Sequence, residues 1–219
     1  MKRLFFASVL LLAACGTGEA ASGSEVPVVI GYQSKTINTV TAGTLLRDKG
    51  FFEQRLASLG RKTGKTYKVT WQDYDTGAPI TAQMIAGKID IGSMGDYPLL
   101  INGSRTQKQG DQGTRMVAVT GYNARGALNM VVVPPTSPAK SLADLAGQKV
   151  SASVGSAGHG TLVRALGDTK VTIENQQPSV GASALQSGNV AALAQFVAWP
   201  GQLVFAGQAK LLYDGAALM

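Results

Sequence analysis

The sequence of 219 residues contains only one cysteine and one histidine. A single cysteine cannot form a disulfide within the chain, so the fold must depend on its hydrophobic core. The single histidine, His159, has no second histidine beside it, and the only cysteine stands far away at position 15. A metal ion or a catalytic relay would need such partners. We therefore expect neither a metal site nor a cofactor.

Sequence signatures of several enzyme classes are also missing. No Gly-x-Ser-x-Gly motif is present, which argues against the nucleophile elbow of one large class of hydrolases. The glycine-rich residues 155–160 lack the lysine of a nucleotide phosphate loop and the glycine spacing of a dinucleotide-binding turn. These absences favour a binding protein over an enzyme.

Charged residues make up only 15% of the chain, although the formal net charge is +7. The lysines and arginines between residues 47 and 68 are scattered over expected helix faces and turns, and aromatic residues are not interleaved with them. A nucleic-acid-binding surface would instead cluster its basic residues and interleave them with aromatic ones, so no nucleic-acid partner is expected. Such a surplus either forms an ordinary solvated surface or attracts anions at long range.

The first fifteen residues have the pattern of an export signal. Lys2 and Arg3 precede an apolar stretch at residues 4–12, which is far shorter than the roughly 20 apolar residues that span a bilayer. Residues 12–15, Leu-Ala-Ala-Cys, resemble the lipobox of bacterial lipoproteins. We expect residues 1–15 to be a lipoprotein signal peptide, with Cys15 lipidated and anchored on the extracytoplasmic face of the membrane. An ordinary cleaved signal peptide is the alternative.

After a small, polar segment at residues 16–25, which predicts a flexible tether, β-branched segments alternate with segments of helical spacing. Strands are expected at residues 26–32, 67–74, 89–92, 116–120, 128–133, 150–154, 171–175 and 196–198. Helices are expected at residues 41–49, 51–59, 79–86, 95–101, 141–145, 161–166 and 179–186. This alternation predicts an α/β fold with mostly parallel sheets. A weak repeat between residues 84–91 and 185–192 favours two related lobes.

Four segments together carry a resemblance to a known family. They are the lipobox and the stretches VVIGYQS, GAPITAQMIAGKIDIGSMGDYPLL and SLADLAGQKVSASVGSAGHGTLVRAL. The chain after Glu25 resembles the substrate-binding proteins of nitrate, sulfonate and taurine ABC importers, the SsuA/THI5-like or NMT1-like family. The resemblance implies a two-lobe, type II periplasmic-binding-protein-like fold, with lobe 1 at residues 26–126 and lobe 2 at residues 127–219.

The same resemblance implies a function and a departure from the family. The protein is expected to be a monomer that captures a small anion, such as an aliphatic sulfonate, and delivers it to an ABC permease. An exported ligand sensor, or a binder of a pyrimidine or another non-anionic nutrient, remains as an alternative. Family members usually continue past the equivalent of residues 214–215. We therefore expect the return segment to lobe 1 to be missing here, which would expose apolar surface and a strand edge.

The residues that follow strands and begin helices are the candidates for ligand binding. The first N–H groups of a helix lack partners and stand at the positive end of the helix dipole, so they can hold a small oxyanion. In open α/β sheets these loops gather at the carboxyl ends of the strands. The candidates are Gln33, Thr39, Thr41, Gly77, Ala78, Gly95, Asp96, Ser156, Gly158, His159, Gly160, Thr161, Gln177, Ser179 and Trp199.

Several of these candidates allow two interpretations. The glycines of residues 155–160 either let the backbone approach a ligand or form a structural turn. His159 is expected to be a neutral donor at the cleft or a surface residue. Asp96 either binds the ammonium group of a zwitterion such as taurine or stabilises a helix dipole. Trp199 either forms a wall of the pocket or packs in the core.

Overall fold

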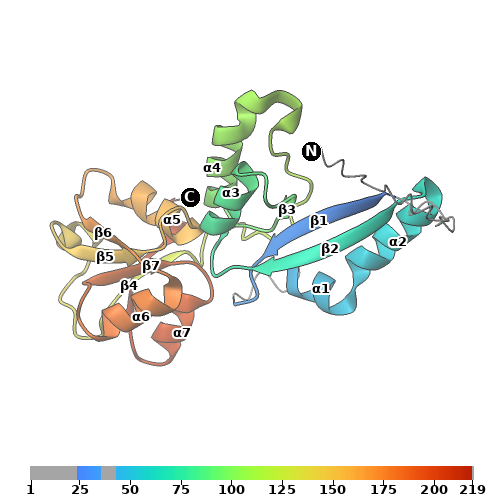
Figure 1. Ribbon diagram of the computed structural model, residues 1–219. Coiled ribbons are helices and arrows are strands. Elements are labelled where there is room, and N and C mark those ends of the chain that lie inside the picture. The colour runs from blue at the N-terminus through green and yellow to red at the C-terminus, as the bar shows by residue number, and fades with distance from the viewer. Residues whose placement is uncertain (1–23, 36–42, 219) are drawn as a thin grey trace, which may run out of the picture.

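The computed structural model describes residues 24–35 and 43–218 (Figure 1). The signal peptide, most of the tether and three candidate residues, Cys15, Thr39 and Thr41, therefore lie outside the described residues. The described chain forms two bodies side by side, each built on its own sheet, with α3 and α4 rising where the two bodies meet.

The first body contains a three-stranded parallel sheet of order β2-β1-β3. Its elements are β1 (Glu25–Tyr32), α1 (Leu45–Lys49), α2 (Phe51–Thr63), β2 (Thr66–Asp73), α3 (Gly77–Ile85), β3 (Ile91–Gly92), α4 (Asp96–Thr106) and the 3-10 helix η3 (Gln107–Gln112). The β-branched run at residues 26–32 forms β1 at the centre of the sheet. Ile30 of β1 and Ile80 of α3 are buried, so α3 covers one face of this sheet.

The second body contains a five-stranded sheet of order β6-β5-β7-β4-β8. Its elements are β4 (Met130–Val133), η4 (Leu142–Leu145), β5 (Lys149–Ala152), α5 (Ala157–Leu166), β6 (Thr172–Asn175), α6 (Pro178–Gln186), β7 (Ala192–Gln195), α7 (Trp199–Phe205), β8 (Lys210–Asp214) and η5 (Gly215–Leu218). β5 is parallel to β6 and β7, whereas β4 is antiparallel to β7 and β8. The sheet is therefore mixed, with its parallel part at β6-β5-β7.

Both faces of the second sheet are covered, which explains the continuous apolar strands in the sequence. Val131, Val132 and Val133 of β4 are all fully buried although successive side chains point to opposite faces. Val131 and Val133 pack with Leu162 of α5 in one core cluster. Val132 packs in the other cluster, which α6 and α7 cover. The predicted α/β fold class is confirmed.

Three predicted element boundaries are wrong for identifiable reasons. Gly60 does not end the second helix, because it is buried inside α2 at a point where a side chain would collide with the carbonyl oxygen of Lys65. Asn102 does not end the fourth helix, since it is buried within α4. The strand expected at residues 196–198 lies earlier, at β7, because the buried Phe196 extends the apolar run past the end of the pairing.

The strand expected at residues 116–120 is also wrong. Residues 114–123 have neither helical nor strand structure, and Val117 and Tyr122 are each 87% exposed. β3, with only two paired residues, is one edge of the first sheet. The first body therefore exposes apolar side chains beside a short strand edge. In the part of the chain that the structure describes, no helix has the length and apolar character needed to cross a membrane.

Candidate functional site

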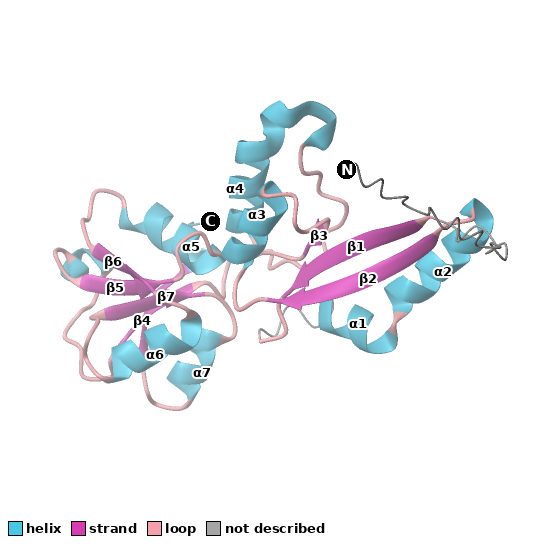
Figure 2. Ribbon diagram, viewed as in Figure 1, coloured by secondary structure: helices cyan, strands magenta, loops and turns pink. Residues whose placement is uncertain are grey.

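The starts of α3, α4 and α5 come together where the two bodies meet (Figure 2). A Cβ atom added at Gly155 would lie 3.1 Å from Cβ of Ala78, and one added at Gly95 would lie 3.2 Å from Cβ of Ala157. The rings of Tyr97 and His159 meet edge to face with centroids 5.8 Å apart. We call this region, residues 76–78, 95–97 and 155–160, the helix-start junction.

The start of α5 is capped by its own side chains. Ser156 is the N-cap residue, and its buried Oγ accepts a hydrogen bond from the backbone N–H of His159 at 3.4 Å. The backbone N–H of Gly155 donates to Nδ1 of His159 at 3.2 Å, which leaves this ring nitrogen without a proton. Partial burial holds the pKa of His159 below its usual value because a charged ring would lose solvation. His159 is therefore a neutral imidazole at this junction.

The glycines of the predicted turn at residues 155–160 have a different role from the expected one. α5 begins at Ala157, so Gly158 and Gly160 lie inside the helix, and only Gly155 belongs to the turn, with φ of 86°. A Cβ atom at Gly158 would lie 2.6 Å from Cα of Gln195, and one at Gly160 would overlap the ring of Tyr97. These two glycines let α5 pack closely on β7 and α4. At Gly158 and Gly160 the α5 backbone therefore lies close to atoms of the protein itself.

The starts of α3 and α4 both lack a side-chain cap, and at α3 the N-cap residue has a side chain that could have supplied one. Thr76 occupies the N-cap position, but its side chain makes no capping hydrogen bond. Its Oγ1 is buried in a residue that is 1% exposed, and it has no hydrogen-bond partner among the described residues. An unpaired buried hydroxyl costs about 1–3 kcal/mol. The first N–H groups of α3, at the predicted Gly77 and Ala78, have no partner within the helix, and the Thr76 hydroxyl has none among the described residues.

The start of α4 already carries a negative charge. Gly95 is the N-cap residue and Asp96 follows it; Oδ1 of Asp96 accepts a hydrogen bond from the backbone N–H of Tyr97 at 2.7 Å. The Asp96 side chain is exposed, and no lysine or arginine of the described chain forms an ion pair with it. This carboxylate stabilises the positive end of α4 and remains able to meet a cation.

The carboxyl ends of β5, β6 and β7 share one chain of hydrogen bonds. Nε2 of Gln195 donates to Oγ of Ser153 at 3.3 Å, and this hydroxyl donates to the carbonyl oxygen of Gln176 at 2.8 Å. Oε1 of Gln195 is buried and has no partner among the described residues. Gln176 leads into Gln177, which starts α6 without a side-chain cap, and Ser179 is exposed nearby. The start of α6 therefore also lacks a side-chain cap.

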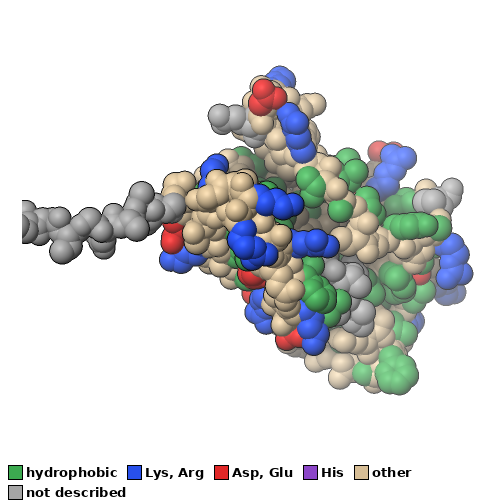
Figure 3. Space-filling model, turned by 90° about the vertical axis from the view of Figure 1, so that its right-hand side faces the viewer, with side chains coloured by type: hydrophobic (Ala, Val, Ile, Leu, Met, Phe, Trp, Pro, Cys, Tyr) green, Lys and Arg blue, Asp and Glu red, His purple; other side chains and the backbone are tan. Residues whose placement is uncertain are grey.

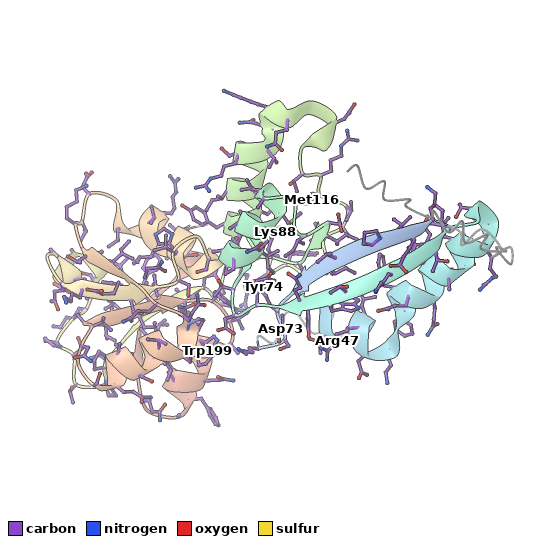
Figure 4. The ribbon with its side chains drawn as sticks, in the orientation of Figure 1. Arg47, Asp73, Tyr74, Lys88, Met116 and Trp199 are labelled. Atoms are coloured by element: carbon purple, nitrogen blue, oxygen red, sulfur yellow. The ribbon has the colours of Figure 1, made fainter. Side chains whose placement is uncertain are left out.

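Two further candidates take part in packing. Nε2 of Gln33, which is buried, donates to the carbonyl oxygen of Ser93 at 3.0 Å and so joins the end of β1 to the segment before α4. Trp199 is half-buried and packs against the core cluster under α6 and α7. Figure 4 shows Trp199 on the side of the second body that is turned toward Asp73 and Tyr74. Thr161, the last candidate in α5, is half-buried and directly follows the junction.

Sequence reasoning missed Thr76, Ser153 and Gln195. Each follows or ends a strand, but the signal that distinguishes them is burial together with a missing or shared hydrogen-bond partner. That signal depends on which segments pack together. Only Thr76 carries a local sequence hint, since a threonine directly before a Gly-Ala-Pro helix start suits the N-cap position.

One face of the molecule carries dispersed charges, and two open hollows lie on the described surface. Figure 3 shows lysine and arginine side chains spread over one face of the molecule, with acidic and apolar side chains between them. An open hollow of about 580 Å³ is lined by residues of α1 and α2, and a second, of about 570 Å³, by residues around Pro134 and Gly188. None of the candidate residues lines either hollow. No group of three metal-ligating side chains occurs among the described residues.

Comparison with known proteins places the fold in a class. No family model matches the chain. The fold is that of type II periplasmic binding proteins: the substrate-binding protein of an amino acid ABC transporter superposes with a TM-score of 0.51 at 17% identity, covering 86% of this chain and 78% of the other.

Within that class, the chain is similar to SsuA sulfonate-binding proteins. An Escherichia coli K12 protein named for binding aliphatic sulfonates is 28% identical over 204 residues, which are 91% of this chain and 58% of the relative. The SsuA structure of Xanthomonas axonopodis pv. citri bound to MOPS superposes with a TM-score of 0.64 and 24% identity, over 91% and 63% of the two chains. The E. coli SsuA structure superposes with a TM-score of 0.59 and 27% identity, covering 88% of this chain and 58% of the other. The chain thus spans about three-fifths of these relatives' length.

Proposed function

We propose that this protein captures a small sulfonate outside the cytoplasm and delivers it to an ABC permease. The observation that carries the proposal is the meeting of three helix starts from the two bodies. Two of them, α3 and α4, lack a side-chain cap, and the start of α3 is accompanied by the unpaired hydroxyl of Thr76. Similarity to proteins named for binding sulfonates points to the same ligand class.

In this proposal the oxyanion is held by dipoles and hydrogen bonds rather than by a basic side chain. The N–H groups at Gly77 and Ala78 and the Thr76 hydroxyl donate to sulfonate oxygens, at the positive end of α3. Exposed N–H groups at the start of α6 supply donors from the second body. Residues 26–126 and 127–219 then act as two lobes that close on the ligand about the α4–α5 contact.

The experiment that tests this function is a thermal-shift screen of the full chain in mild detergent. Ethanesulfonate at about 100 times Kd should add roughly 2.7 kcal/mol to the free energy of unfolding. Thr76→Val keeps the shape of the side chain but removes the hydroxyl, and should weaken binding about fivefold without lowering stability. Thr120→Val, in the exposed segment, is the matched control and should change neither quantity. Stabilisation by a pyrimidine alone, with no response to any sulfonate, would contradict the proposal.

The proposed membrane attachment depends on a residue outside the described part of the chain. The Leu-Ala-Ala-Cys sequence supports lipidation of Cys15, which would hold the binding protein close to its permease. Cys15→Ser should move the protein from the membrane fraction to the soluble fraction of the producing cells. If the variant stays in the membrane fraction, the anchor is not this cysteine.

A further inference from the structure

The end of the first body where β1 and β2 begin and α2 ends (Figure 1) carries a group of basic side chains. Its members are exposed and lie close together in the sequence: Arg61, Lys62, Lys65 and Lys68. Between residues 54 and 72 the chain has no acidic residue. We call these four residues the basic end. Its charges are of one sign, whereas the face seen in Figure 3 mixes both signs.

The backbone holds the basic end beside the point where the chain enters β1. Gly64 ends α2 in the left-handed region, with φ of 70°, and its N–H donates to the carbonyl oxygen of Gly60 at 2.8 Å. β2 then pairs in parallel with β1, so that Thr66 lies opposite Glu25. The basic end and the start of β1 are therefore neighbours in space.

Most of the charge of the basic end is not neutralised within the protein. Lys68 forms an ion pair with Glu25, in which Nζ and Oε1 are 3.8 Å apart and both side chains are exposed. Exposed pairs of this kind contribute little. Arg61, Lys62 and Lys65 form no ion pair among the described residues. The basic end is therefore a surface that favours a negatively charged partner.

The sequence limits the distance between this surface and the proposed lipid anchor. Residues 16–24 separate Cys15 from β1, and such a segment spans at most about 32 Å when fully extended. Its one charged residue, Glu19, does not cancel the positive charge of the basic end. The other end of β1 lies about 25 Å farther along the strand. Attachment through Cys15 therefore brings the basic end closer to the membrane than the opposite end of β1.

We propose that the basic end is a second membrane contact, which binds the headgroups of anionic phospholipids and orients the protein on its anchor. This inference rests on the attachment proposed above. An anionic surface attracts basic side chains within about 8 Å at physiological ionic strength. Leu59, which is 43% exposed and lies one turn before Lys62 on α2, adds an apolar contact at the level of the headgroups. A lipid chain combined with a basic surface gives stable attachment.

Stabilisation of the α2 dipole is the other role open to these residues. Basic side chains in the last turn favour the negative end of a helix, which accounts for Arg61 and Lys62. It does not account for Lys65 and Lys68, because both lie beyond the helix. A role confined to the helix dipole also predicts no response to lipid, so vesicles distinguish the two roles.

The experiment measures how fast each lysine is acetylated by a brief pulse of acetic anhydride, read by peptide mass spectrometry. The full chain is reconstituted through its anchor into vesicles of phosphatidylcholine, alone or mixed with phosphatidylglycerol. Lys62, Lys65 and Lys68 should react about fivefold more slowly on the anionic vesicles, because the lipid surface covers them. Lys108 in η3 and Lys170 in the second body are exposed internal controls and should keep their rates. Added salt should remove the difference.

A paired substitution tests the charges themselves. In Lys62→Gln with Lys65→Gln, Lys68 should lose its protection on the anionic vesicles, because half of the basic residues are gone. Lys108→Gln with Lys170→Gln makes the same change in net charge away from the basic end and should keep that protection. All four substituted lysines are exposed, so neither variant disturbs the core.

The outcomes separate this inference from the anchor on which it rests. If the full chain does not stay on phosphatidylcholine vesicles, the proposed anchor fails and the inference fails with it. If the chain stays but the lysines of the basic end react equally on both kinds of vesicle, the anchor stands and the inference is overturned. Equal slowing at Lys108 and Lys170 would also overturn it, as would the same slowing by inorganic phosphate on phosphatidylcholine vesicles, since a free anion would then be the partner.

Discussion

At the scale of single residues, His159 shows how burial and hydrogen bonding fix a protonation state. Its Nδ1 accepts the N–H of Gly155, and its ring edge meets the ring of Tyr97. A proton on Nδ1 would break the first contact and place a positive charge beside the positive end of α5. The same burial that lowers the pKa of His159 therefore makes the neutral ring part of the structure of the junction.

This protonation state gives the junction a pH dependence of known sign. The pKa of His159 is lower in the folded protein than in the unfolded chain, where it is about 6.5. The unfolded chain therefore binds this proton first, and stability decreases as the pH falls below about 6.5. The free energy of unfolding in urea should be lower at pH 5.5 than at pH 7.5. In His159→Gln the difference between the two pH values should shrink. An unchanged difference would show that other groups cause it.

At the scale of secondary-structure elements, α5 joins the two bodies through glycines. Gly158 brings the helix onto β7, and Gly160 lets the Tyr97 ring of α4 lie directly on its backbone. The α5–β7 contact therefore depends on the absence of a side chain at position 158, and the α4–α5 contact on its absence at position 160. A helix normally loses stability where glycine replaces alanine, so the close approach must offset that loss.

Gly160→Ala tests this packing. Its new Cβ would overlap the Tyr97 ring, so we expect a loss of about 1–3 kcal/mol in the free energy of unfolding, measured by denaturant titration. Gly103→Ala in α4 is the matched control, since a Cβ there meets nothing within 4 Å. It should raise stability by roughly 0.5–1 kcal/mol. Equal effects of the two substitutions would mean that the α4–α5 contact is loose.

The elements also show what local sequence could and could not predict. The run VPVVIGY predicted β1, and the three valines of β4 predicted a strand covered on both faces, because burial on both sides leaves a continuous apolar pattern. Residues 116–120 are also apolar and rich in valine, but no neighbouring strand pairs with them, so they do not form a strand. A strand is stabilised by its neighbours, and a one-dimensional pattern does not contain them.

The candidate site was predicted in outline and missed in detail for a related reason. Helix starts after strands can be located from glycine and proline positions, and this placed residues 77–78, 95–96 and 156 close together. Which starts are capped depends on side-chain geometry. Ser156 caps α5 and Thr76 leaves α3 uncapped, although both residues suit an N-cap position by type.

At the scale of the whole molecule, two covered sheets meet at one junction of helix starts (Figure 1). The second body has two complete core clusters, whereas the first has a three-stranded sheet with a short edge and exposed apolar residues beside it. The arrangement is similar to that of the SsuA structures, and the chain spans about three-fifths of the length of these relatives. The central claim is that backbone amides at the starts of α3 and α6 hold the ligand.

Backbone amide chemical shifts measured during titration with ethanesulfonate test that claim most directly. The account predicts shifts that saturate together and are largest at Gly77, Ala78 and Ser179, with smaller changes at Gly155 and His159. Saturating shifts confined to the hollow beside Phe51 and Phe52, or no shifts at any ligand concentration, would contradict it.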